Sequence, residues 1–102
     1  MNKFKIDLPC PVVISEAAKN EINYIFNAKN IPKEYGLRVG VNGGGCSGVS
    51  YFIGFDLQKE ADQVYLSFQV PLLIEKKHAM FLWGVTVDFV DTAEERGFVF
   101  NK

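Results

Sequence analysis

Hydrophobic and polar positions alternate along most of this chain with the two-residue period of half-buried strands. A continuous apolar run at 70–74 indicates one more strand. Pro71 has no N–H to donate, so that strand lies at a sheet edge or begins at the proline. Taken together, these patterns predict strands at 12–14, 37–42, 49–55, 64–68, 70–74, 85–89 and 97–100.

One segment has a helical period instead, with its apolar residues on one face from about 16 to 29. Ser15 precedes this helix as a cap, and Pro32 follows its end. A second, short helix is expected at 75–83, where Gly84 stops it. The predicted fold is therefore mostly β (α+β): a compact and mostly antiparallel β-sheet with one N-terminal helix and a short second helix.

The composition limits what this fold can do. With 102 residues, of which 48% are hydrophobic, the chain fills one core, so we expect a single domain over 1–102. The net charge of -1 gives no basic field for nucleic acid or for an anionic membrane, and no apolar run is long enough for a membrane helix. Aromatic side chains are expected in the core and at sheet edges, with some available to an oligomer interface: Phe52, Phe55, Phe81, Trp83, Phe89 and Phe98.

The N-terminus has lysines but no sustained apolar stretch before Pro9 and Pro11, which does not fit a signal peptide. We therefore expect a cytoplasmic protein in a reducing compartment, where both Cys10 and Cys46 are free thiols. Cys10 lies between the two prolines, and its extended backbone fits an incidental thiol better than an extra metal ligand.

Glycines surround Cys46 in the segment Gly43-Gly44-Gly45-Cys46-Ser47-Gly48, which joins two predicted strands. A bulged turn with a small buried cysteine is one interpretation, but a plain hairpin needs fewer glycines. Because the neighbouring glycines have no side chains, the sulfur of Cys46 is accessible. The backbone N–H groups around it can stabilise a thiolate and donate hydrogen bonds to the sulfides of a cluster. We therefore predict that Cys46 is a functional thiol in a binding loop formed with Gly44, Gly45, Ser47 and Gly48.

Two other functions for this segment fit less well. Its glycines satisfy the dinucleotide-binding pattern G-x-G-x-x-G, but a strand follows where that motif needs a helix N-terminus. A cysteine hydrolase would need His78, the only histidine, beside Cys46, with an orienting Asn or Asp. No local signature of such a triad is present, and His78 is expected to be solvated on the charged short helix. An enzyme is not expected.

The stretch 37–51 resembles the hallmark strand–loop–strand of the A-type iron–sulfur carrier family, also called HesB-like or IscA-like. The resemblance covers 15–100 and includes 85–90 and Gly97-Phe98-Val99-Phe100-Asn101 near the end of the chain. It implies a HesB-like β-sheet sandwich or barrel with its core at about 12–101, assembled as a homodimer or tetramer. It further implies that Cys46 binds iron or a [2Fe-2S] or [4Fe-4S] cluster, which passes to recipient apoproteins or cluster-assembly proteins.

The sequence departs from the family at several points. Members continue into a tail with a Cys-x-Cys pair, whereas this sequence ends at Asn101-Lys102, so only Cys46 matches a family cysteine. Glu75 stands where Asp is usual, and Phe68-Gln69 replaces the usual hairpin turn. An iron–sulfur cluster takes about four protein ligands. Binding is therefore expected to be weak or absent unless a second copy, a partner or a small thiol completes the site. The alternative is a family member without a cluster that acts as a protein-binding or regulatory module.

Overall fold

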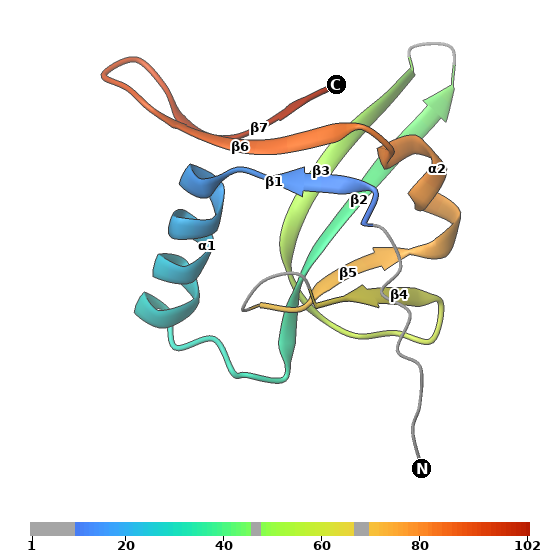
Figure 1. The fold of residues 1–102 in the computed structure, drawn as a ribbon, viewed down its shortest axis with the longest axis horizontal. Helices are drawn as coiled ribbons and strands as arrows, with labels where there is room; N and C mark the ends of the chain where they lie inside the picture. The colour runs from blue at the N-terminus through green and yellow to red at the C-terminus, as the bar shows by residue number, and fades with distance from the viewer. Residues whose placement is uncertain (1–9, 46–47, 67–69) are drawn as a thin grey trace, which may run out of the picture.

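Two β-sheets with a helix packed beside them make up the protein in the computed structural model, which describes residues 10–45, 48–66 and 70–102 (Figure 1). The strands are β1 Val12–Ile14, β2 Tyr35–Gly45, β3 Gly48–Leu57, β4 Asp62–Tyr65, β5 Leu72–Glu75, β6 Val85–Asp91 and β7 Arg96–Asn101. The helical segments are α1 Glu16–Ala28, the 3-10 turn η1 Lys76–His78 and α2 Ala79–Leu82. The mostly β fold with one N-terminal helix and a short second helix is confirmed.

The strand order is β1-β6-β7 in one sheet and β3-β2-β5-β4 in the other. Neighbours along the chain pair antiparallel, as β2 with β3, β4 with β5 and β6 with β7. Two parallel pairs, β1 with β6 and β2 with β5, join segments that are distant in sequence. The strand after Pro71 begins at Leu72 and lies inside its sheet, between β2 and β4, and the Pro71 carbonyl accepts the Leu37 N–H of β2. Of the two predicted options, the strand start is correct.

The sequence signals at Ser15 and Pro32 predicted the bounds of the helix α1 correctly to within one residue at its end. The Ser15 hydroxyl accepts the Ala18 N–H at 3.1 Å, and α1 then runs to Ala28, one residue short of the predicted end. The same hydroxyl donates to Asp88 of β6 at 2.6 Å, which fixes the helix start on the first sheet. At the other end, the ring of Phe26 lies 5.7 Å from that of Phe55 on β3. The helix is thereby tied to both sheets.

The core lies between the helix and the two sheets. On β2, Leu37, Val39 and Val41 are buried, so the predicted alternation is confirmed there. The alternate positions Arg38, Gly40 and Asn42 face away from the core. This outer face of β2 is where polar groups gather. The other fully buried large side chains are Ile22, Leu72, Ile74, Leu82, Val85 and Val87.

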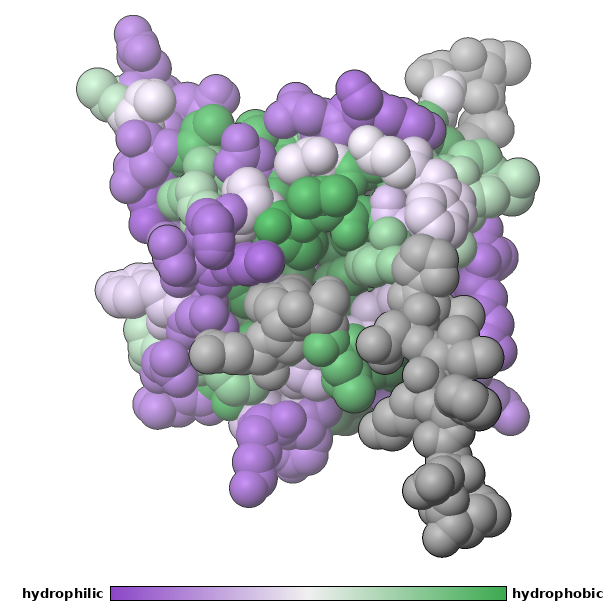
Figure 2. All heavy atoms as spheres, viewed as in Figure 1, coloured by the Kyte–Doolittle hydropathy of each residue, from purple (hydrophilic) through white to green (hydrophobic). Residues whose placement is uncertain are grey.

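Two expectations about the C-terminal half need correction. The strand predicted at 64–68 is β4, which pairs with β5 only up to Tyr65, and Leu66 is exposed. Residues 67–69, including the departure at Phe68-Gln69, lie outside the described residues. Phe81 and Trp83 are exposed, not in the core, because the short α2 buries only Leu82. Figure 2 shows hydrophobic side chains gathered in the middle of the face that carries β1, with polar side chains around them.

Candidate functional site

The glycine-rich segment lies at the end of a long hairpin. β2 and β3 stay paired from Tyr35 and Leu57 up to Gly45 and Gly48, with an irregularity in register between Gly43 and Gly45. The segment is therefore mostly strand, not the open loop that the glycines suggest. Gly43 and Gly48 have φ angles of 85° and 87°, a region that side chains other than glycine rarely adopt. Of the predicted site, Gly44, Gly45 and Gly48 belong to the hairpin arms, while Cys46 and Ser47 lie outside the described residues.

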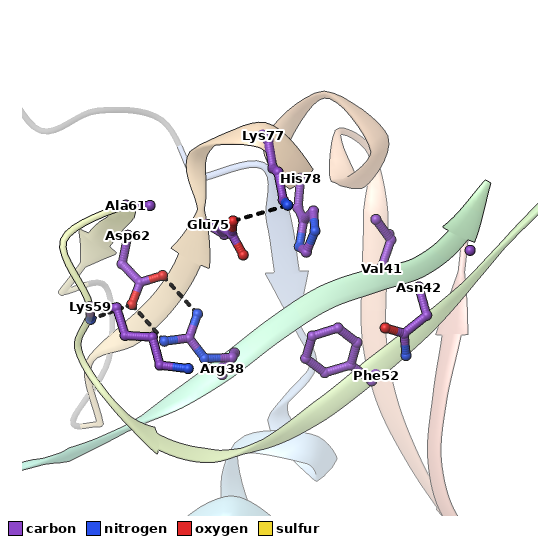
Figure 3. A pocket seen from close by; sticks show the side chains of 11 residues that line it. Arg38, Val41, Asn42, Phe52, Lys59, Ala61, Asp62, Glu75, Lys77 and His78 are labelled. Atoms are coloured by element: carbon purple, nitrogen blue, oxygen red, sulfur yellow. Dashed lines mark hydrogen bonds and ion pairs between the residues drawn. The ribbon is translucent and has the colours of Figure 1, made fainter.

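Beside this hairpin, the outer face of the four-stranded sheet is hollowed into an open groove of about 530 Å³ (Figure 3). Asn42 and Gly43 line the end of the groove that belongs to the hairpin arm. Its walls come from β2, β3, β4 and β5, from η1 and from the turn at Lys59. The sequence alone does not reveal this groove, because its side chains come from segments that only the sheet order brings together.

Arg38 is the centre of the groove's charged floor. Its guanidinium donates to both carboxylate oxygens of Asp62, at 2.7 and 2.6 Å, and to Asp56 at 2.8 Å. The Asp62 side chain is only 1% exposed, and the Lys59 N–H also donates to it. Hydrogen bonds from Arg38 lower the pKa of both aspartates, and Asp62 in turn raises the pKa of Arg38. The only sign of this ion pair in the sequence was that Arg38 lies between the apolar strand positions Leu37 and Val39.

His78 closes the groove on the side of η1, and it is half-buried, not solvated as predicted. Its ring meets the Phe52 ring edge-on, with 6.4 Å between centroids (Figure 3). Phe52 is the cross-strand partner of Gly40, and a Cβ at Gly40 would lie 2.6 Å from Phe52 and 2.8 Å from His78. Gly40 therefore makes the space in which the two rings pack.

We expect Gly40→Ala to destabilise the fold by about 1–2 kcal/mol, because the new methyl displaces the Phe52 and His78 rings. Gly54→Ala is the matched control, since Gly54 is also in this hairpin and a Cβ there meets nothing within 4 Å. Alanine at that position should leave stability unchanged or raise it by about 0.5 kcal/mol. Urea unfolding of the two variants checks this, and equal effects would contradict the packing role of Gly40.

Cys10 lies apart from the hairpin, packed against the hydrophobic core beside β1. Burial raises the pKa of its thiol, although a backbone hydrogen bond with Val12 offsets part of this effect. A protonated, half-buried thiol is a poor metal ligand. Within 10–45, 48–66 and 70–102, no group of three or more His, Cys, Asp or Glu residues could hold a metal ion.

Comparison with known proteins decides the family. A family model described as iron–sulphur cluster biosynthesis matches residues 11–102. The chain belongs to this family. The iron-binding protein IscA of Xenorhabdus nematophila is 40% identical over 92 residues, which are 89% of this chain and 84% of that protein. The iron–sulfur cluster insertion protein ErpA of Glaesserella parasuis is 32% identical over 94 residues, 91% of this chain and 82% of that one.

The fold agrees with this membership. The crystal structure of IscA with a [2Fe-2S] cluster superposes with a TM-score of 0.70 at 22% identity and covers 88% of this chain and 83% of that one. The predicted resemblance to A-type carriers and the HesB-like fold are thereby confirmed. Within the described part of the chain, no helix is long and apolar enough to cross a membrane. The cytoplasmic location stays a prediction.

Proposed function

We propose that this protein is an iron–sulfur carrier, a single-domain member of its family that binds iron or a [2Fe-2S] or [4Fe-4S] cluster as cargo through Cys46. It passes that cargo to recipient apoproteins. The observation that carries the proposal is the long β2–β3 hairpin, whose paired ends Gly45 and Gly48 flank Cys46 in the sequence. The names of the relatives, iron-binding and cluster insertion proteins, support the same function.

The hairpin suits a cargo that must arrive and leave. Gly44, Gly45 and Gly48 carry no side chains, so a cluster and a second protein can approach this end of the hairpin closely. Backbone N–H groups at Gly44, Gly45, Ser47 and Gly48 are the donors we assign to cluster sulfides. With one cysteine ligand from each copy, the cluster is held between copies and is exposed to exchange.

The fold argues against a thiol enzyme at Cys46. His78, the only histidine, packs over Gly40. Gly40 and Gly45 are separated by roughly 16 Å of extended strand, because a strand rises about 3.3 Å per residue. A general base must lie within hydrogen-bond reach of the thiol that it serves, so this distance from Gly45, the residue before Cys46, supports a function other than that of a thiol enzyme. We therefore propose binding and transfer, not catalysis, as the function.

Anaerobic incubation with iron and sulfide tests the proposal, followed by metal analysis, visible absorption and transfer to an apo-ferredoxin. We expect less than one cluster per chain, and we expect that cluster to appear in the ferredoxin. A protein that binds neither iron nor cluster under any of these conditions would contradict the carrier function. The absence of another metal-binding group in the described residues would then favour the alternative, a binding or regulatory module.

We also predict self-association, because a single Cys46 per chain needs a neighbour to build a thiolate site. Exposed Met80 and Trp83 on and after α2, with Val13 on β1, supply apolar surface for such contacts. Light scattering should give the mass of a dimer or tetramer. Trp83 is the only tryptophan, and its fluorescence should shift to shorter wavelength as the concentration rises. A monomeric mass at high concentration, with or without iron, would contradict this.

A further inference from the structure

The outermost strand of the four-stranded sheet has an open edge. β3 is last in the order β3-β2-β5-β4, and within the described part of the chain β2 is the only strand that pairs with it (Figure 1). Its register with β2 is regular from Leu57 to Val49. Because only alternate residues of β3 direct their N–H and C=O groups toward β2, the other half of these groups faces away from the sheet.

β3 lacks the features that protect edge strands. Proteins block such edges with short strands, charged residues, prolines or bulges. The other edge strands of the two sheets follow this rule: β1 has three residues and comes directly after Pro11, β4 has four residues, and β7 begins at Arg96. β3 has ten residues, and its segment 48–55 is uncharged and contains no proline. Such an edge pairs readily with another strand.

Packing of its side chains holds β3 in place. On the face toward the core, four side chains are partly buried against it: Val49, Tyr51, Ile53 and Phe55. The Tyr51 ring also stacks on that of Phe100 in β7, with 5.2 Å between centroids. On the opposite face Ser50 and Gly54 are exposed, and a Cβ at Gly54 would meet nothing within 4 Å. A strand fixed in this way loses little further freedom when it accepts a partner.

A second copy of the chain is the partner that suits this edge. When two-fold symmetry pairs a strand with its own copy, a charge near the middle of the strand meets a like charge, which opposes pairing. β3 carries no charge there. Its single charged residue, Asp56, lies near the end of the strand, and Arg38 neutralises it at 2.8 Å. The strand is therefore complementary to itself in charge.

We propose that two copies of this protein pair antiparallel through the free edges of β3, which joins two four-stranded sheets into one. Side chains that stand opposite each other in such a pair share a face, so the two-fold axis passes beside a residue, not between two. An axis at Phe52 pairs nearly the whole strand and sets Ser50 opposite Gly54 of the second copy. Asp56 then faces Gly48, which is uncharged. This inference goes beyond the proposed carrier function and needs no iron.

Paired variants at the two exposed positions test this contact. Ser50→Glu/Gly54→Glu sets like charges opposite each other across the axis, whereas Ser50→Lys/Gly54→Glu sets opposite charges there. Both variants share the change at Gly54, whose φ is not positive and whose partner on β2 is Arg38, so they differ only in the charge at position 50. Sedimentation velocity of the metal-free proteins should give a dissociation constant at least about tenfold higher for the first variant. Equal constants would overturn the inference.

Hydrogen exchange of the unmodified, metal-free protein gives a second measurement that needs no substitution. At high protein concentration, alternate amides between 49 and 55 should exchange at least about tenfold more slowly than at low concentration. The amides of β7 are the control and should not change. Equal exchange of the β3 amides at both concentrations would overturn the inference, and so would protection that appears only when a recipient apoprotein is added to a monomer. Neither experiment measures iron, so a negative result leaves the carrier function standing.

Discussion

Cys46→Ser should abolish the binding of iron and of an iron–sulfur cluster, whatever the oligomeric state of the protein. Serine keeps the size and backbone preferences of the residue between Gly45 and Gly48, but its hydroxyl stays protonated at neutral pH. Iron in a sulfide cluster prefers thiolate, so the loss should reach at least about a hundredfold in iron retained per chain. Anaerobic reconstitution with metal and sulfide analysis measures it.

Two variants control for unspecific effects on this binding. Cys10→Ser removes the half-buried thiol beside the core, and His78→Ala removes the only histidine. Both should bind as the parent does, with at most a loss of stability. If Cys46→Ser binds as well as the parent, the glycine hairpin is a structural turn. If Cys10→Ser abolishes a stable cluster, the site uses both thiols of each copy.

Arg38→Ala should be the most destabilising change on the outer face of the sheet. It leaves Asp62, whose side chain is 1% exposed, without its charged partner, and an unpaired buried carboxylate costs about 3 kcal/mol or more. Arg96→Ala is the control: Arg96 is 57% exposed, pairs with Glu21 at 3.1 Å and packs on Phe89, and should cost about 1 kcal/mol or less. Urea unfolding at pH 7 compares them. The double variant Arg38→Ala/Asp62→Asn should recover part of the lost free energy of unfolding, because it no longer buries an unpaired carboxylate.

The pH dependence follows from the same pair. Arg38 holds the pKa of Asp62 and Asp56 below the value of about 3.9 that unfolded aspartate has. Because the folded-state pKa is lowered, this stabilisation is fully present above about pH 4 and is lost as the pH falls through the folded-state pKa. The urea midpoint should therefore fall steeply below about pH 4. Arg38→Ala should flatten that fall, and an equally steep fall in the variant would show that other groups cause it.

Local patterns in the sequence determined the elements of this protein. Ser15 caps the helix because its hydroxyl accepts the backbone N–H of Ala18 in the first helical turn. This contact is local and needs no residue from elsewhere in the chain. The alternation of Leu37, Val39 and Val41 placed one face of β2 in the core, because side chains of a strand point to opposite faces. The density of glycines around Cys46 made that residue the candidate thiol, which stays a prediction, and the resemblance of the stretch 37–51 indicated the family.

Only the tertiary structure decided how these elements meet. The parallel pairs of β1 with β6 and of β2 with β5 join segments far apart in the sequence, and no local signal specifies such partners. That sheet order brings Asp62 of β4 to Arg38 of β2, and places His78 over Gly40 against Phe52. From the sequence alone, a charged residue in a strand or helix is expected to face solvent, because its buried partner cannot be identified. The groove beside the hairpin therefore became visible only when strands distant in sequence lay side by side.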